Sequence, residues 1–315
     1  MKEAASHRVR RTRTATAIRP PWSASELAEL VTVLDWWRFA VSALGRAGAA
    51  FGQGTLNAAD DAAFLVLGAL DLPLGDVAPF SQARVTRSER RRLAAALHAR
   101  VVERRPTAYV LGFTELQGVR FKVTPEVLIP RSPLAELLCA ESPPGLSTAP
   151  ARILDLCTGS GCLAVLAALA FPEATVWATD ISSAALAVAR ENVALHRLDE
   201  RIALIEADGF AGLEGERFDL IVCNPPYVTS ESMHALPPEF RWEPRQALAG
   251  GRDGMDFLRA VLPSLGNHLT EQGIAFFDVG HNRRFVEQAF PDWPFVWIET
   301  EGAADAVFMI ERRQL

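Results

Sequence analysis

The motif Asn224-Pro225-Pro226-Tyr227 combines residue types that could hold a reacting group in one orientation. It follows the apolar run Phe218–Cys223, which is typical of a buried strand. Proline fixes its own φ at about −65° and has no N–H, and a residue that precedes proline is held in extended geometry. Because Asn224 and Pro225 both precede a proline, we expect their carbonyl groups to point in nearly fixed directions.

An amino group bound at this motif could donate one hydrogen to the side-chain oxygen of Asn224 and the other to the backbone carbonyl of Pro225, while Tyr227 offers an aromatic face. Such a site would bind a planar nitrogen nucleophile, either the exocyclic amine of a nucleobase or a carboxamide. Both are poor nucleophiles because the nitrogen lone pair is delocalised, and accepting both hydrogens would favour the pyramidal geometry of attack. In the competing interpretation, the prolines only end the strand.

A glycine-containing turn, "ILDLCTGSGC", lies upstream, where Asp155 ends an apolar run and Gly159 and Gly161 precede a helical stretch. Glycines let a ligand approach the backbone closely, and a helix N-terminus offers unpaired N–H groups. The turn lacks the last glycine of the GxGxxG dinucleotide fingerprint. A carboxylate in the turn would repel a pyrophosphate, but it suits a ligand that carries an ammonium and a sulfonium group.

Two further acids follow the next two apolar runs. Asp180, twenty-five residues after Asp155, is placed to accept both hydroxyl groups of a ribose, and Asp208 in "EADGF" could accept from an adenine amino group. Taken singly, Asp180 could cap the helix that begins near Ser182, and Asp208 could be a turn residue. Three acids that end successive strands beside a glycine turn favour a nucleoside-binding site.

Apolar runs alternate with helical stretches from residue 151 onward, which predicts a mostly parallel α/β sheet covered by helices on both faces. The predicted strands are "RILDL", "TVWAT", "IALIEA", "FDLIVC", "GIAFFDVG", "FVWIET" and "AVFMIERR". The last two are separated by too few residues for a helical crossover, so at least one of them must run antiparallel.

Helical periodicity dominates residues 22–106. Ser23 and Glu26 form a capping-box pattern that predicts a helix continuing to Leu44. A second helix is predicted over 60–70, and a third covers "TRSERRRLAAALHARVVERR" and stops before a proline. We therefore predict a small helical N-terminal domain.

The remaining segments complete the predicted organisation. Residues 109–123 alternate between apolar and charged types around Gly118, which predicts a β-hairpin. We divide the chain into a disordered basic N-terminus (1–21), the helical domain (22–106), a hairpin and linker (107–150) and a catalytic domain (151–315).

Charge is unevenly distributed around the net value of −6. Residues 1–20 carry six basic side chains and one acid, which is typical of a transit peptide or of a disordered bacterial N-terminus. Residues 84–105 carry eight arginines and two glutamates. This basic stretch could contact RNA phosphates weakly, or it could be a solvated helix face.

Cysteine usage and hydropathy narrow the class of protein. The four cysteines are Cys139, Cys157, Cys162 and Cys223, and none of them forms a CxxC pair. We therefore expect reduced thiols, a cytoplasmic protein and no metal site. No run of eighteen or more apolar residues occurs, so we expect no membrane partner.

The glycine turn with its three acids resembles that of the S-adenosylmethionine-dependent methyltransferases with a Rossmann-like sheet. The resemblance implies a class I methyltransferase fold in which the turn holds the methionine part, the second acid the ribose and the third region the adenine. The cofactor-binding residues would be Asp155, Cys157, Thr158, Gly159, Ser160, Gly161, Asp180, Ile181, Asp208, Gly209 and Asn224. A strand-end Asn, Asp or Ser followed by two prolines and an aromatic residue is typical of the amino-group methyltransferases within this class.

Longer stretches are similar to the protein glutamine methyltransferases, which modify a side-chain amide in translation proteins. These stretches are "TAYVLGFTELQGVRFKVTPEVLIPR", "ILDLCTGSGC" and "NPPYV". Where the release-factor branch usually continues "IPRP", this chain reads "IPRSPLAEL". This segment resembles the branch that acts on the third large-subunit ribosomal protein, free or in a ribosomal particle. Three further stretches share this resemblance: "FGQGTLNAADDA", "LPPEFRWEP" and "DAVFMIERRQL". The resemblance implies that Asn224, Pro225, Pro226 and Tyr227 are catalytic.

We assign substrate binding to Asn224, Pro225, Tyr227 and Arg131. Arg131 could instead orient the linker, hold the cofactor carboxylate or form a surface salt bridge. The chain departs from the family at three positions. Cys157 stands where many relatives have glycine, Gly209 replaces a bulky residue, and Leu116 replaces an aromatic that contacts substrate, with Phe113 as a candidate replacement.

Two functions other than glutamine methylation of a ribosomal protein or of a release factor stay open at this point. One is methylation of a nucleobase amino group in RNA or DNA, which requires flipping of the base. The other is a non-catalytic assembly factor that uses the fold only to bind ribosomal precursors.

Overall fold

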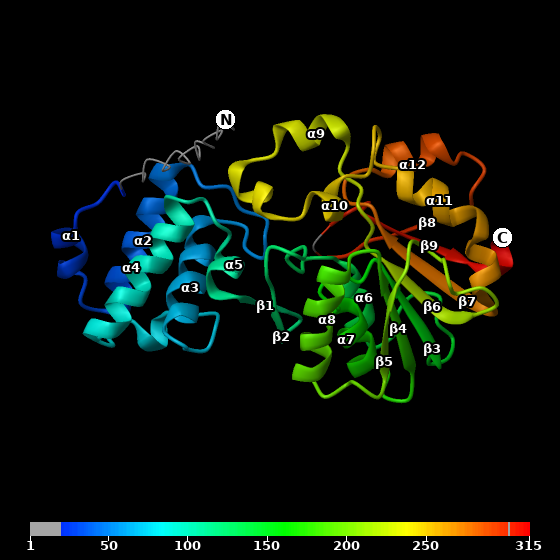
Figure 1. Ribbon diagram of the computed structural model, residues 1–315, viewed down its shortest axis with the longest axis horizontal. Coiled ribbons are helices and arrows are strands. Elements are labelled where there is room, and N and C mark those ends of the chain that lie inside the picture. Colours follow the sequence, from blue (N-terminus) through cyan, green and yellow to red (C-terminus); the bar gives the residue numbers. More distant parts are fainter. Residues whose placement is uncertain (1–19, 302) are drawn as a thin grey trace, which may run out of the picture.

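The computed structural model describes residues 20–301 and 303–315, and it places a helical region beside an α/β domain (Figure 1). The predicted disordered segment 1–21 lies outside these residues, apart from its last two prolines. The helical region contains α1 (Ala24–Glu29), α2 (Val33–Ala47), α3 (Ala58–Ala69), the short η1 (Ala78–Phe80) and α4 (Arg87–Val101). Its apolar faces form one separate cluster that includes Trp36, Phe39, Leu65 and Leu93.

The first predicted helix is interrupted, and the interruption has a local cause. The expected capping box at Ser23 and Glu26 is present at the start of α1. However, Thr32 has extended geometry and forms a second capping box with Asp35, which starts α2. A residue that caps a helix cannot also continue one, so the single predicted helix becomes two.

The connection between the two regions is more helical than predicted. Residues 107–111 form α5 (Thr107–Leu111), so the hairpin starts later than expected, with β1 (Phe113–Leu116) and β2 (Val119–Lys122) paired antiparallel. Gly112 ends α5 with φ +79°, in the left-handed region that favours glycine. Within the predicted linker, α6 (Leu134–Cys139) packs on the sheet.

The large domain contains a seven-stranded sheet of order β5-β4-β3-β6-β7-β9-β8. The strands are β3 (Arg152–Leu156), β4 (Thr175–Asp180), β5 (Ile202–Glu206), β6 (Phe218–Cys223), β7 (Leu269–Asp278), β8 (Val296–Ile298) and β9 (Val307–Glu311). Strands β3 to β7 are parallel, and β9 runs antiparallel to both β7 and β8. The predicted mostly parallel sheet with an antiparallel last strand is confirmed.

Helices cover both faces of this sheet, as expected for a parallel sheet. One face packs against α6, α7 (Cys162–Ala170) and α8 (Ser183–Leu195), and the other against α11 (Asp256–Leu265) and α12 (Arg283–Ala289). The remaining short elements are α9 (Ser230–Ala235), η2 (Pro238–Trp242), α10 (Arg245–Leu248), η3 (Gly266–His268) and η4 (Arg312–Gln314). In Figure 1 the segment with α9 and α10, drawn in yellow, lies between the helical region and the sheet.

Candidate active site

A cavity of about 420 Å³ opens at the carboxyl ends of β3 to β6, where ligands of doubly wound sheets bind. It brings together most of the residues that the sequence assigns to the cofactor. Those that line it are Cys157, Thr158, Gly159, Ser160, Asp180, Ile181, Asp208, Gly209 and Asn224, together with Pro226 and Arg131. Among the predicted site residues, Asp155, Gly161, Pro225 and Tyr227 lie outside the lining.

Asp155 lies beneath the glycine turn and is fully buried. One carboxylate oxygen, Oδ2, accepts hydrogen bonds from the Thr158 hydroxyl and the Ala164 N–H, whereas Oδ1 is buried without a hydrogen-bond partner among the described residues. Burial raises the pKa of this carboxyl to about 7, although both hydrogen bonds oppose the shift. The carboxyl lies beneath the turn that lines the cavity, so its charge would act on a cationic ligand there through space and not by direct contact.

The turn itself is held in a strained backbone form. Cys157 has φ +62°, a left-handed conformation that side chains rarely adopt and that favours glycine. Gly159 and Gly161 also have positive φ, and a Cβ at Gly161 would lie 3.1 Å from the Ala189 side chain. The turn therefore packs tightly on α8, and its backbone faces the cavity.

Asp180 connects the glycine turn to the second strand. Its Oδ2 accepts from the Gly159 N–H at 2.9 Å, and its Oδ1 accepts from the Ser182 N–H at 2.9 Å. The cap of α8 is the Ser182 side chain, so Asp180 does not itself cap that helix. Burial raises the pKa of Asp180. Each oxygen keeps a second lone pair, which fits a role as acceptor for two ribose hydroxyl groups.

Ile181 and the turn at Asp208 and Gly209 also line the cavity. Ile181 is about half exposed, which is unusual for an isoleucine and makes it available to pack on a planar ring. Asp208 is exposed and lines the cavity. Gly209 has φ +58°, and a Cβ there would lie 3.2 Å from Val261, so the bulky residue of relatives would crowd α11.

The proline motif divides into a half that faces the cavity and a half that packs behind it. Asn224 and Pro226 line the cavity, while Pro225 is buried. The Tyr227 ring packs on Gly280, where a Cβ would lie 2.7 Å from the ring. Gly280 therefore lies against the half-buried Tyr227 ring, and the predicted stacking of this ring on an acceptor stays a prediction.

Arg131 is paired with a carboxylate that the sequence did not assign. Its guanidinium donates to both oxygens of the buried Glu243, at 2.5 and 3.1 Å, and to the Ile129 carbonyl at 3.0 Å. Glu243 also accepts from the Ile129 N–H. Of the roles considered for Arg131, this geometry favours orientation of the linker.

Leu116, which stands where the family has an aromatic, and Phe113, its candidate replacement, both lie outside the cavity lining. The Arg120 guanidinium stacks on the Phe113 ring at 3.4 Å from its centroid, and Leu116 packs against the sheet core. Neither residue is positioned by this structure to contact an acceptor in the cavity.

Several site residues were missed by sequence reasoning because their partners lie far away along the chain. The Ser132 hydroxyl donates to the buried Asp278 at 2.8 Å at the end of β7, close to the motif. The side-chain amide of Asn282 donates to the Tyr227 carbonyl. In the sequence, Ser132 in "IPRSP" and the stretch "LPPEFRWEP" stand out as typical of one branch of the family. Neither stretch indicates which distant residue it contacts.

The described residues contain no group of three or more metal-ligating side chains, and none of their helices is long and apolar enough to cross a membrane. The donor set fits S-adenosylmethionine. Asp180, Ile181 and Asn224 line one cavity, where they would hold its ribose, its adenine ring and the acceptor, and the buried carboxyl of Asp155 beneath the turn would favour its cationic groups.

Comparison with known proteins agrees with this chemistry. The model of the methyltransferase small domain matches residues 139–249. The ribosomal protein uL3 glutamine methyltransferase of Bordetella pertussis is 47% identical over 91% of this chain and 97% of its own length, and that of Bradyrhizobium diazoefficiens is 45% identical over 91% and 92%. A solved ribosomal protein L11 methylase from Lactobacillus delbrueckii subsp. bulgaricus aligns at 25% identity over 56% of this chain and 77% of its own, with a TM-score of 0.39. Since its identity to curated relatives is this high over nearly their whole length, the chain belongs to the family of ribosomal protein uL3 glutamine methyltransferases.

Proposed function

We propose that the protein transfers a methyl group from S-adenosylmethionine to the side-chain amide nitrogen of a glutamine in ribosomal protein uL3. The observation that carries the proposal is the position of Asn224, whose side chain lines the same cavity as the turn above Asp155 and the carboxylate of Asp180. The names of the most similar relatives support uL3 as the protein that carries the glutamine.

When bound, S-adenosylmethionine supplies an activated methyl group on a sulfonium. The chain's own contribution is orientation and hydrogen bonding. Asn224, which lines the cavity, accepts one amide hydrogen, which draws electron density toward the nitrogen and favours its attacking geometry. The Pro225 carbonyl is the predicted acceptor for the second hydrogen, although Pro225 itself lies outside the cavity lining. Once the amide nitrogen has gained the methyl group it carries a positive charge, and this cationic amide is acidic enough to lose its extra proton to water, so no general base is required. Pro226 keeps this pair of acceptors in place.

We further propose that residues 22–106 form the domain that recognises uL3. The basic stretch within it is already occupied in part by internal contacts. Five of its eight arginines contact other groups of the protein: Arg90, Arg92, Arg100, Arg104 and Arg105. A weak rRNA contact by the remaining arginines therefore stays a separate prediction, as does the choice between free uL3 and a ribosomal particle.

The direct test is incubation of the purified chain with radiolabelled S-adenosylmethionine and one acceptor at a time. The acceptors are free uL3, ribosomal particles, a peptide chain release factor, and rRNA or DNA. We expect label on uL3, located by mass spectrometry to one glutamine. Label confined to a release factor or to nucleic acid would overturn the proposal. A deletion strain, grown in parallel, should lack the methyl group on uL3 and regain it with the intact gene, as expected for an enzyme that acts in the cytoplasm.

If an Asn224→Ala variant without methyl transfer restored ribosome assembly fully, the non-catalytic assembly factor would be the better description. This outcome is distinct from a change of acceptor, because it requires that no acceptor be methylated in the rescued strain.

A further inference from the structure

Residues 229–248 form a loop that leaves the proline motif and returns beside it. We call it the post-motif loop. Its base is closed next to Tyr227, because the Val228 N–H donates to the Leu248 carbonyl at 2.7 Å and the Gly250 N–H donates to the Val228 carbonyl at 2.9 Å. The returning limb lines the cofactor cavity through Pro244, Gln246 and Ala247. The loop is therefore one wall of the space that an acceptor must enter.

This loop has almost no apolar core of its own. Between residues 229 and 247, all of which the structure describes, the two buried residues are both glutamates, Glu239 with 0% and Glu243 with 4% of its surface exposed. Phe240 and Trp242 are half-buried. Because buried carboxylates are stable only when they are paired and hydrogen-bonded, the contacts of these two groups restrict where the loop can lie, together with the contacts of Phe240 and Trp242 with Arg131 and Arg105.

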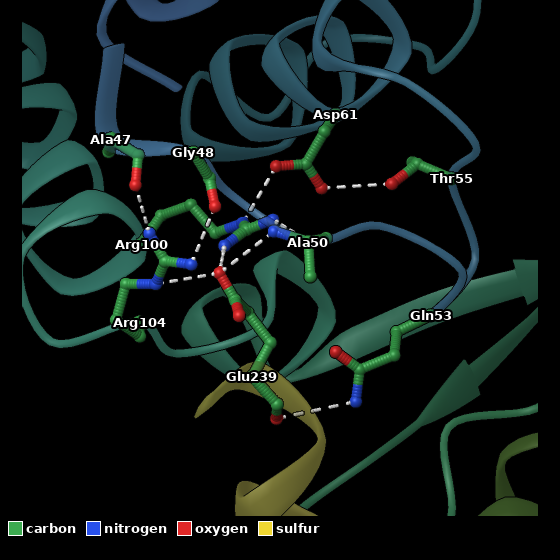
Figure 2. A network of polar contacts seen from close by, with 9 residues as sticks. All are labelled: Ala47, Gly48, Ala50, Gln53, Thr55, Asp61, Arg100, Arg104 and Glu239. Carbon is green, nitrogen blue, oxygen red and sulfur yellow. Dashed lines mark hydrogen bonds and ion pairs between the residues drawn. The ribbon is translucent and has the colours of Figure 1, made fainter. Parts of the chain in front are cut away.

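Glu239 extends from the loop into the helical region (Figure 2). Its Oε1 accepts from the Ala50 N–H at 3.1 Å and from Arg100 at 3.3 Å, and it forms an ion pair with Arg104 at 2.8 Å. The backbone carbonyl of Glu239 accepts from the Gln53 side chain at 3.5 Å. Each partner belongs to the helical region, so Glu239 joins that region to the loop, in addition to the stacking of Arg105 on the Trp242 ring at 4.8 Å.

The partner arginines are themselves fixed by the helical region. Arg100 is 2% exposed and donates to Asp61 on α3 at 2.7 Å and to the Ala50 carbonyl at 2.9 Å. Arg104 donates to the carbonyls of Ala47 and Gly48, at 2.6 and 2.8 Å. The arginines are thus held in place independently of the loop, and Glu239 meets a preformed cationic site (Figure 2).

We infer that Glu239 is a positioning residue, which fixes the post-motif loop against the helical region and so keeps the acceptor wall of the cavity in register with the domain that recognises uL3. The inference rests on the proposed function for its substrate, but its structural part does not. Loss of this attachment should affect use of the protein substrate much more than binding of the methyl donor, whose proposed binding residues follow β3, β4 and β5.

The test variant is Glu239→Gln, which removes the charge and keeps the shape. The amide oxygen can still accept from the Ala50 N–H at the Oε1 position. The Oε2 position has no hydrogen-bond partner among the described residues, so an NH₂ group placed there displaces no existing contact. The ion pairs with Arg100 and Arg104 are lost.

A matched control is Asp61→Asn. Asp61 is a buried carboxylate paired with the same Arg100, at 2.7 Å, but it lies on α3 within the helical region and has no contact with the post-motif loop. Both variants leave Arg100 with one carboxylate instead of two. A general loss of stability should therefore appear in both, whereas release of the loop should appear only in Glu239→Gln.

Two measurements decide the question. In hydrogen–deuterium exchange, Glu239→Gln should exchange faster than wild type over residues 229–248, and Asp61→Asn should match wild type there. In steady-state assays, Glu239→Gln should lower kcat/KM for uL3 by about 10- to 100-fold, mainly through KM, because a displaced wall misplaces the acceptor. Affinity for S-adenosylmethionine by calorimetry should be unchanged in both variants.

The inference is overturned if exchange over 229–248 is the same in Glu239→Gln and wild type, or if both variants lower kcat/KM equally. If Glu239→Gln does not fold, the double variant Glu239→Gln, Arg104→Gln restores the charge balance of the cluster and gives the same two measurements. Should wild-type protein not methylate uL3, the proposed function fails, yet the exchange comparison still decides whether Glu239 fixes the loop.

Discussion

The side-chain amide of Asn282 donates a hydrogen bond to the backbone carbonyl of Tyr227 across 2.6 Å. Asn282 lies directly before α12, and Tyr227 is the last residue of the proline motif. This bond joins the motif to the loop that follows β7. It fixes the end of the motif opposite to Asn224, which lines the cavity.

We expect Asn282→Ala to lower kcat by about 10-fold, because an unpaired Tyr227 carbonyl lets the motif shift relative to the bound amide. Affinity for the methyl donor should change little, since Asn282 lies outside the cavity lining. The exposed Asn267 offers a matched control, and Asn267→Ala should keep full activity. Equal kcat in both variants, measured at saturating donor, would contradict the positioning role of Asn282.

Gly250→Ala should disrupt the motif by contact alone. A Cβ at this position would lie 2.7 Å from both the Pro226 carbonyl oxygen and the Tyr227 Cα, so the backbone of the motif must move. We expect kcat to fall by about 100-fold. Gly45 lies in α2 with no atom within 4 Å of its added Cβ, so Gly45→Ala should keep activity and raise stability by about 0.5–1 kcal/mol. Activity assays and thermal unfolding distinguish the two; an active Gly250→Ala enzyme would refute the steric argument.

Variants of Asn224 test whether methyl transfer requires its side-chain oxygen as a hydrogen-bond acceptor. We expect Asn224→Ala to lower kcat by about 100-fold or more, in line with loss of one transition-state hydrogen bond in an enclosed site. Asn224→Asp retains an acceptor oxygen and should keep more activity than the alanine variant. Single-turnover methyl transfer to uL3, at saturating donor, provides the comparison. Equal activity of the alanine and aspartate variants would show that the side-chain oxygen does not act as proposed.

Asp155 should make donor binding depend on pH. Burial raises the pKa of this carboxyl to about 7 in the ligand-free protein, so it is largely protonated in acid and ionised in mild alkali. Because the donor is cationic, its affinity should rise from about pH 6 to about pH 8 as the carboxylate ionises. Calorimetric titration across this range should show the rise for wild type and a flatter profile for Asp155→Asn. Identical pH profiles would exclude Asp155 as the group responsible.

The same pKa shift predicts an effect on stability of the opposite sign. The folded protein retains a proton on Asp155 that the unfolded chain loses near the ordinary aspartate pKa of 3.8, so the stability contributed by this group declines as the pH rises from 3.8 to about 7. The Asp155→Asn variant has no carboxyl at this position, so its stability does not decline for this reason as the pH rises. Without ligand it should unfold at a higher temperature than wild type at about pH 8, and the difference should shrink in acid. A lower unfolding temperature at both pH values would contradict the assignment.

Local sequence patterns predicted most of the sheet. Strands β3 to β7 and β9 follow apolar runs that were visible as such, and the antiparallel last strand followed from the short connection after β8. The misses were also local in origin. Thr32 starts a second helix within a continuous apolar pattern, and residues 107–111 are helical although they continue into a hairpin. In both cases a capping or terminating residue outweighed the periodicity around it.

For the site, the sequence by itself determined the chemical groups. Each of these groups lies at the end of a strand or directly after it in the chain: the glycine turn, the acids and the acceptor before two prolines. Because parallel strands end at one edge of the sheet, the groups are expected to lie together there. Only the tertiary structure decided the pairings that hold these groups: Glu239 with Arg100, Glu243 with Arg131, Ser132 with Asp278 and Asn282 with Tyr227. Such pairs join residues that are tens to more than a hundred positions apart, and no local pattern specifies which buried charge will meet which partner. That choice is made when the core excludes water and each buried polar group must find a partner within reach.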